Sequence, residues 1–299
     1  MKIDVIAGSS APGLTYDIAS ALGARSHFPV VEKFPDGETH IIAPGIKELD
    51  NVVYVQTMHP DPNEMLIEMA LTADLIKEMG AKRLIAAVPY LGYTRQDKRH
   101  EEGEAVSIKP VLRMLETSGV DDILSVDIHL HRLTLDDLTN MTSINFHEVS
   151  AVDSIAKVAG RNLSRPLVIG PDSESERWAK RAAELLGSSY DVLEKRRLSA
   201  TEIEITPKSV DVRGKDVLII DDIVSTGGTI KEVVSSVRSK GANKVVAAFT
   251  HGVLSDEDAV PGLYRAGVSE LISTNTINNE FSRVDVAPIL ARKLKEMIG

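Results

Sequence analysis

The sequence predicts an α/β protein built on mainly parallel sheets flanked by helices. Short apolar runs alternate along the chain with amphipathic helical stretches, the order that a parallel sheet with crossover helices requires. The apolar runs are continuous, as expected of strands buried on both faces. A pattern also occurs twice, as GAKRLIAAV at 80–88 and as GANKVVAAF at 241–249, which indicates that one α/β unit is used twice.

The elements follow from these patterns in chain order. Strands are predicted at 4–8, 51–57, 83–90, 122–129, 166–172, 216–222, 244–252 and 269–274. Helices are predicted between them at 63–80, 107–119, 175–187 and 229–241. Several of these helices close on glycine, the expected signal for a helix end.

The repeated pattern predicts the domain organisation. Each copy follows a long helix, and each of those helices follows an apolar strand, at 51–57 and 216–222. This shared order favours duplication over chance similarity between two helix–glycine–strand units. The prediction is therefore two related domains, 1–147 and 148–299, although no Gly/Ser-rich linker marks the boundary.

Composition bounds the function. The chain has 299 residues, 43% hydrophobic and 26% charged, which is ordinary for a globular protein of two domains. It has no cysteine, which excludes disulfides and thiolate metal sites and is consistent with a cytoplasmic protein. A net charge of −10 argues against nucleic acid or an anionic membrane as the main partner. No apolar stretch suggests a signal peptide or a membrane span.

The stretch VLIIDDIVSTGGTI at 217–230 combines an acidic pair with a turn of small residues. Asp221 and Asp222 end an apolar run. The turn that follows consists of Ser225, Thr226, Gly227, Gly228 and Thr229. Glycines allow close approach of a ligand to the backbone, and the amides at a helix start attract anions. The plain alternative is a tight strand–helix turn, but two adjacent buried carboxylates need partners.

This stretch resembles the phosphoribosyl-pyrophosphate loop of the type I phosphoribosyltransferase fold. Further stretches occur at FPDGETHI (34–41), PYLGYTRQDKRH (89–100), SVDIH (125–129), GPDSESER (170–177), EKRR (194–197) and THGVLS (250–255). Together they resemble the ribose-phosphate pyrophosphokinase family over essentially the whole chain. The resemblance implies two tandem phosphoribosyltransferase-like domains, with ATP on the side of 1–147 and the ribose 5-phosphate loop in 148–299.

The resemblance also implies a reaction. The diphosphoryl group of ATP would pass to the anomeric hydroxyl of ribose 5-phosphate, giving 5-phosphoribosyl 1-diphosphate and AMP, with Mg²⁺ as cofactor. Asp221 and Asp222 would bind the ribose hydroxyls, and Ser225 to Thr229 would bind the 5-phosphate. Because the chain is acidic overall, phosphorylated substrates require a local basic cluster or a divalent metal.

Lys195 and Arg197 are the candidate catalytic residues. They alternate near the end of YDVLEKRR, so on a strand they share one face. The resemblance implies that Lys195 is the catalytic cation and that Arg197 contacts the phosphates, including ribose 5-phosphate. Without the resemblance, a solvated basic strand end would be the favoured explanation.

Two segments are candidates for ATP binding. The first consists of Arg95, Gln96 and Asp97, directly after a predicted strand. The second consists of Phe34, Asp36, Gly37 and Glu38 in FPDGE, which as bare sequence is a β-turn. In the family this second segment reaches the active site of a neighbouring subunit. The resemblance therefore implies a homo-oligomer, a dimer or larger, with a shared ATP site.

His129 and Asp172 each end a predicted strand, and the resemblance implies that they are magnesium ligands. Asp172 suits Mg²⁺ better, because this ion prefers oxygen ligands. His129 with His131 could also form an H-x-H pair for a transition metal.

Other functions remain open at this point. A phosphoribosyltransferase that consumes the product would not need the stretches at 89–100 and 194–197. A non-catalytic regulatory subunit should have lost Lys195, Arg197 or the aspartate pair, all of which are present. A nucleotide sensor is supported only by the loops.

Overall fold

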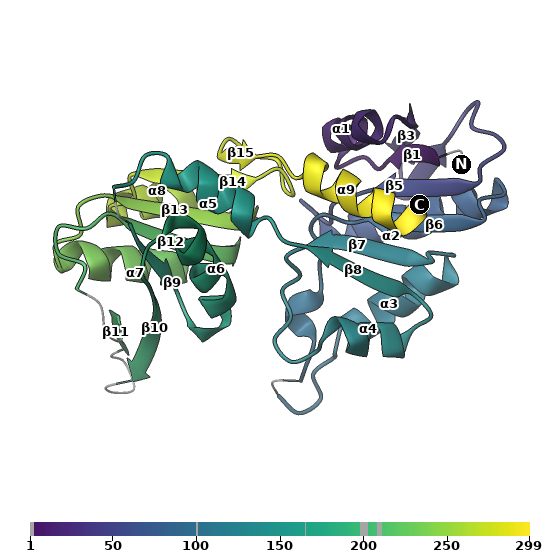
Figure 1. Cartoon of the computed structure of the whole chain (residues 1–299). Helices are drawn as coiled ribbons and strands as arrows, with labels where there is room; N and C mark the ends of the chain where they lie inside the picture. Colours follow the sequence, from purple (N-terminus) through teal and green to yellow (C-terminus); the bar gives the residue numbers. More distant parts are fainter. Residues whose placement is uncertain (1–2, 100, 165, 198–202, 208–210) are drawn as a thin grey trace. The chain divides into compact units, whose positions relative to one another are not determined.

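The structure is a computed structural model that describes residues 3–99, 101–164, 166–197, 203–207 and 211–299. Its strands and helices alternate along the chain (Figure 1). The chain divides into two compact units, one formed by Met1–Val149 with Val286–Gly299 and the other by Ser150–Asp285. Each unit has its own sheet, so the predicted α/β class with mainly parallel sheets is confirmed.

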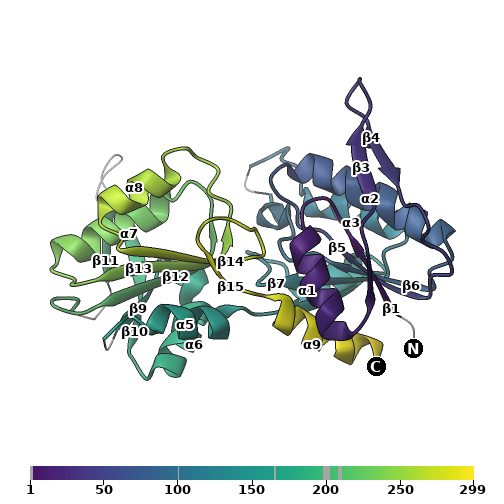
Figure 2. The same cartoon turned by 90° about the horizontal axis from the view of Figure 1, so that it is seen from above.

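The first unit contains a parallel six-stranded sheet in the order β2-β1-β5-β6-β7-β8. Its strands are β1 (Ile3–Ala7), β2 (Arg25–His27), β5 (Asn51–Val55), β6 (Arg83–Ala87), β7 (Asp122–Val126) and β8 (Asn145–Val149). Its helices are α1 (Pro12–Leu22), α2 (Pro62–Glu78), α3 (Ile108–Thr117), α4 (Leu135–Met141) and α9 (Ala287–Ile298). In Figure 2, α1 and α9 lie on one side of the sheet and α2 and α3 on the other.

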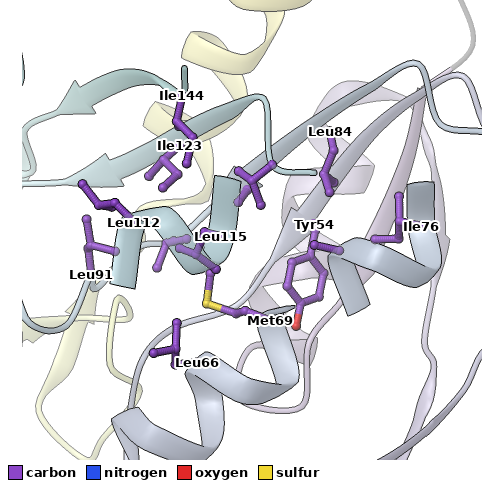
Figure 3. Close-up of a cluster of buried hydrophobic side chains, with 14 of the residues drawn as sticks. Tyr54, Leu66, Met69, Ile76, Leu84, Leu91, Leu112, Leu115, Ile123 and Ile144 are labelled. Carbon is purple, nitrogen blue, oxygen red and sulfur yellow. The ribbon is translucent and has the colours of Figure 1, made fainter. Parts of the chain in front are cut away.

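A hydrophobic core fills the space between this sheet and the helices α2 and α3 (Figure 3). Tyr54 and Leu84 come from neighbouring strands, and Met69 comes from α2. Helix α3 contributes Leu112 and Leu115, whose three-residue spacing places both side chains on the buried face. This packing holds the central strands in place. The loops that follow their carboxyl ends are therefore held in defined positions.

The second unit contains a seven-stranded sheet in the order β11-β10-β9-β12-β13-β14-β15. Its strands are β9 (Leu167–Gly170), β10 (Tyr190–Arg197), β11 (Ile203–Pro207), β12 (Val217–Val224), β13 (Val245–Gly252), β14 (Glu270–Thr274) and β15 (Ser282–Val284). All neighbours are parallel except β10 and β11. Helices α5 (Val152–Gly160) and α6 (Glu176–Leu186) lie on one side, and α7 (Gly228–Ser239) and α8 (Ala259–Ala266) lie on the other (Figure 2).

The structure differs from the expected domain division at the carboxyl terminus. The sequence placed residues 148–299 in one domain, whereas Val286–Gly299 joins the first unit. Helix α9 buries Leu290 and Leu294 and lies against α1 (Figure 1). The Arg83 guanidinium also donates a hydrogen bond of 2.6 Å to the carbonyl of Met297 near the helix end. No pattern in the sequence had singled out this helix, so its return was not foreseen.

Candidate functional site

The turn after β12 leaves the start of α7 open. Gly227 is the N-cap residue in the left-handed region, with φ of 74°, and no side chain of the described residues caps the helix. A helix start carries backbone N–H groups without partners and a partial positive charge. Thr226 and Gly228 are exposed beside it. The turn predicted as an anion loop therefore has free donors that a phosphate could accept.

A second segment holds this turn in place. The amides of Leu254 and Ser255 donate to the carbonyls of Val224 and Ser225 at 3.0 and 3.1 Å. The hydroxyls of Ser225 and Ser255 also lie 3.1 Å apart. Leu254 adopts a positive φ of 46°. The stretch THGVLS contains Ser255, but nothing in the sequence linked it to the loop, because contact between loops distant in sequence leaves no local pattern.

Three carboxylates gather at the carboxyl edge of β9 and β12. Asp222 is buried, and its amide donates to Asp221 Oδ1 at 3.0 Å. Asp172 follows β9 and accepts the amides of Glu174 and Ser175 at the start of the short helix η2 (Ser173–Ser175). Burial, followed by the charges of Asp222 and Asp172, raises the pKa of Asp221 well above its ordinary value. The cluster is thus electrostatically costly until hydroxyl donors or a cation arrive.

The candidate catalytic residues lie on β10 beyond the end of its neighbour. Strand β10 pairs with β9 only as far as Val192 opposite Gly170. Lys195 and Arg197 pair instead with Ile205 and Ile203 of β11. Their backbone therefore continues past the carboxyl edge of the sheet, by roughly 10 Å at Lys195 for three residues of strand. The side chains of both residues lie outside the described part of the structure.

His251 lies beside the acidic pair on β13, opposite Ile223. Its ring is buried, and Nδ1 lies 2.9 Å from the hydroxyl of Thr276. Thr274 and Thr276 in turn donate to the carbonyl of Thr250. The stretch THGVLS indicated His251 from the sequence. No pattern indicated the threonines that hold its ring in place.

In the first unit the ATP candidates Arg95 and Gln96 form the short helix η1 (Thr94–Gln96) after β6. Arg95 is exposed. The Nε2 of Gln96 is buried without a hydrogen-bond partner among the described residues. An adjoining cavity of about 510 Å³ is lined by Asp97, Lys98, Arg99, Ala105, Val106, Lys109, Pro110 and Arg113. Four cations around one cavity form the basic cluster that a phosphorylated substrate requires in a chain of charge −10.

The metal candidate His129 lies after β7, three residues beyond its last residue. Its Nε2 lies 3.3 Å from Nε2 of His131, with the rings edge to face. The amide of Ile128 donates to the Glu148 carboxylate at 2.6 Å. The segment that carries His129 is therefore held from β8.

The other candidate ATP segment is the tip of an antiparallel hairpin, β3 (Val30–Lys33) and β4 (Thr39–Ile42). Phe34, Asp36, Gly37 and Glu38 are all exposed there. The amide of Gly37 donates to the carbonyl of Phe34 at 2.8 Å, as the expected β-turn requires. The hairpin extends beside α2 (Figure 2). A cavity of about 490 Å³ between them is lined by Gly37, Glu38, Thr39, Asn63, Glu64, Ile67 and Leu71.

Comparison with known proteins identifies the family. Residues 3–119 match the model for the N-terminal domain of ribose phosphate pyrophosphokinase, and residues 145–285 match the phosphoribosyl transferase domain. A ribose-phosphate pyrophosphokinase of Methanopyrus kandleri is 37% identical over 298 residues, which cover 99% of each chain. The chain belongs to the ribose-phosphate pyrophosphokinase family. The ribose-phosphate pyrophosphokinase 2 of Archaeoglobus fulgidus is 38% identical, covering 97% of this chain and 99% of that protein.

A solved structure agrees with this family. Phosphoribosylpyrophosphate synthetase from Mycobacterium smegmatis matches with a TM-score of 0.86 and 30% identity, covering 99% of each chain. The predicted tandem of phosphoribosyltransferase-like domains and the predicted enzyme class, a ribose-phosphate diphosphokinase, are thereby confirmed. No helix among the described residues is long and apolar enough to cross a membrane.

Proposed function

We propose that the chain transfers the β,γ-diphosphoryl group of ATP to the anomeric oxygen of ribose 5-phosphate. A bond forms between that oxygen and the β-phosphorus, and the bond from the β-phosphorus to the bridging oxygen of AMP breaks. The observation that carries this proposal is the open start of α7 beside the acidic cluster. Free amides suit the 5-phosphate, while Asp221 and Asp222 suit the ribose hydroxyls.

On the donor side, we assign ATP to the turn formed by Arg95, Gln96 and Asp97. The unpartnered Nε2 of Gln96 is a donor for a base or a phosphate, and the adjoining cations suit a polyphosphate. Lys195 and Arg197 supply positive charge to the transferring group, because spread negative charge in this transition state requires cations. Positioning and charge are the main requirements of the reaction, and these residue types meet both.

Magnesium fits the acidic cluster better than it fits His129. Burial, followed by the charges of Asp222 and Asp172, raises the pKa of Asp221, and a divalent cation with oxygen ligands would relieve this cost. His129 offers a nitrogen, which Mg²⁺ accepts less readily. When bound, Mg²⁺ would neutralise phosphate charge. The protein's own residues orient the ribose and hold AMP.

A homo-oligomer, a dimer or larger, completes the proposal. Phe34, Asp36, Gly37 and Glu38 are all exposed at the hairpin tip, which leaves them free to reach the ATP site of a neighbouring copy. Light scattering combined with activity across a dilution series tests this. An active monomer would refute the shared site. Given its lack of cysteine, we place the protein in the cytoplasm.

The reaction is tested by incubating the protein with ATP, Mg²⁺ and ribose 5-phosphate. AMP should form in equal amount to the sugar diphosphate. Formation of ADP, or AMP release that does not depend on ribose 5-phosphate, would exclude the proposed transfer. The variant Lys195→Ala should lose turnover by roughly 100- to 1,000-fold while still binding ATP, and turnover close to that of the wild type would remove Lys195 from the mechanism.

A further inference from the structure

Asp97 has an unusual set of contacts for a residue expected to bind ATP. It is only 3% exposed, and its Oδ2 accepts three successive backbone amides. These come from His131 at 2.9 Å, Arg132 at 2.7 Å and Leu133 at 3.0 Å. Successive amides that converge on one oxygen form an anion-binding nest. Here the anion is a side chain of the protein itself.

These contacts connect two loops that are far apart in the sequence. One is the η1 turn, which Tyr93 enters in the left-handed region with φ of 64°. The other follows β7 and is entered by Asp127 with φ of 39°. Non-glycine residues rarely adopt this conformation, and it persists only where surrounding contacts impose it. Asp97 contacts the second loop beyond this turn, at residues 131–133.

The second loop is held by a carboxylate on each side of His129. Upstream, Glu148 accepts the amide of Ile128 at 2.6 Å. Downstream, Asp97 accepts the three amides that begin at His131. Burial alone would raise the pKa of Asp97, but the amides of Arg132, Leu133 and His131 outweigh it, and the pKa lies below its usual value. The carboxylate is therefore charged and its bonds to the amides are strong.

We propose that Asp97 is a positioning residue, whose carboxylate fixes the His129 loop to the turn that carries Arg95 and Gln96. The proposal rests on the proposed function, in which that turn serves ATP, and on His129 as the second metal candidate named from the sequence. It changes the role expected for Asp97, because Oδ2 is committed to the protein. Oδ1 is buried without a partner among the described residues, so direct contact with ATP through that oxygen is the rival explanation.

Hydrogen exchange tests the contact without any substrate. In Asp97→Ala the amides of residues 131–133 lose their acceptor, and their exchange should accelerate by at least about tenfold. Asp97→Asn retains one acceptor oxygen. Its acceleration of exchange at residues 131–133 should therefore be several-fold smaller than that of Asp97→Ala. Unchanged exchange at 131–133 in Asp97→Ala would overturn the proposal, whether or not the protein makes phosphoribosyl diphosphate.

A matched control lies in the other unit. Asp216 is also buried and accepts a backbone amide, that of Ser164 at 2.7 Å, together with the side chain of Asn243. It precedes β12 and so lies at the opposite end of the sheet from the acidic cluster. Asp216→Ala should accelerate exchange near Ser164 and leave residues 131–133 unchanged. A general loss of stability would instead accelerate exchange in both places.

Kinetics separate positioning from direct ATP contact. For a positioning residue, Asp97→Asn should keep the dissociation constant for ATP within about twofold. Its kcat should fall more than its affinity, and more Mg²⁺ should be needed for half-maximal activity. Asp97→Ala should show the same pattern more strongly. If Asp97→Asn instead weakens ATP binding by more than about tenfold while exchange at 131–133 stays at the wild-type rate, Asp97 contacts ATP directly and the positioning role is wrong.

Discussion

The turns after β5 and β12 occupy the same place in two similar sheets and end differently. Each strand lies between the first strand of its unit, β1 or β9, and the strand of the repeated pattern, β6 or β13. After β5, the Asp61 carboxylate accepts the amides of Asn63 and Glu64 at 3.0 and 3.2 Å and closes the start of α2. After β12, no described side chain closes the start of α7.

In the proposed function, this difference lets two related units diverge in function without changing their scaffold. A capped helix start satisfies its own donors, and an open one is available to an external anion. The units agree at the other end of the same helices. Gly80 and Gly241 both follow the helix with positive φ, 93° and 89°. Their next residues donate back to Ile76 and Val237 at 3.3 and 3.0 Å, so the repeated sequence corresponds to a repeated helix end.

The largest effect should come from closing the open helix start in the manner of α2. Gly227→Asp places a carboxylate at the N-cap of α7, where two like charges a few Å apart repel by about 3 kcal/mol at a protein surface. The value of kcat/KM for ribose 5-phosphate should fall roughly 100-fold or more, measured at constant ionic strength.

The control for this change is Gly227→Asn. A Cβ at this position would meet its nearest neighbour, Leu263, at 3.5 Å, which is ordinary contact. Asparagine and aspartate tolerate the left-handed region similarly, so both variants carry the same backbone strain. Asparagine should therefore lose much less activity. Equal losses in the two variants would mean that anion binding at this turn is not the basis of the difference between the units.

The next effect concerns the helix ends that the units share. Gly80→Ala and Gly241→Ala each force a side chain into the left-handed region, at a cost of about 1–2 kcal/mol in the free energy of unfolding. The two costs should be similar, because a Cβ at Gly241 would lie at an ordinary contact distance of 3.4 Å from Cγ of Arg213, and no described atom lies within 4 Å at Gly80. Calorimetry compares the two, and a much cheaper Gly241→Ala would contradict the equivalence of the helix ends.

The sequence predicted the central strands and their following helices because their signals are local. Continuous apolar runs placed β5, β6, β12 and β13, and the acidic pair with its glycines placed the turn proposed to bind ribose 5-phosphate. The resemblance to a known family added the functions expected of the two units. These features are encoded within a few neighbouring residues, so no tertiary information was needed to find them.

Contacts between distant segments could not be predicted in the same way. The return of α9 to the first unit depends on its packing against α1 and on Arg83. The support of the Ser225 loop by Ser255 depends on two turns that meet only in the folded sheet. Asp97 was expected at ATP because its neighbours are Arg95 and Gln96, whereas its partners lie more than thirty residues away. Nearly every residue type has a backbone amide, so the sequence does not show which amides a carboxylate accepts.

A smaller effect, on the free energy of unfolding, should follow from neutralising the acidic cluster after β12. The turn after β5 has no such acidic pair. The pKa of Asp221 is raised, so the folded protein retains a proton that the unfolded chain has released above the ordinary carboxyl pKa of 3.8. The free energy of unfolding therefore falls as pH rises from there through the raised pKa. Asp221→Asn should abolish this loss and stabilise the protein at pH 8 by about 1 kcal/mol.

Thermal unfolding of the wild type and Asp221→Asn at pH 5 and pH 8 measures this difference. Asparagine can still accept the amide of Asp222, so the turn itself should persist. The affinity for ribose 5-phosphate should fall at the same time, because an amide accepts ribose hydroxyls more weakly than a carboxylate does. A variant that is destabilised at pH 8 would show that Asp221 is well paired in the folded protein.

The smallest effect should come from opening the closed turn. Asp61→Ala removes the cap of α2, and because Asp61 is exposed we expect a loss of about 0.5–1 kcal/mol in the stability of the first unit. Asp61→Asn, which retains a capping oxygen, should cost only a few tenths of a kcal/mol. The KM for ribose 5-phosphate should stay unchanged in both, since the second unit carries the phosphate loop. Hydrogen exchange at Asn63 and Glu64 locates the effect. An altered KM for ribose 5-phosphate would show that the start of α2 also serves the substrate, and the contrast between a closed and an open helix start would no longer divide the two units by function.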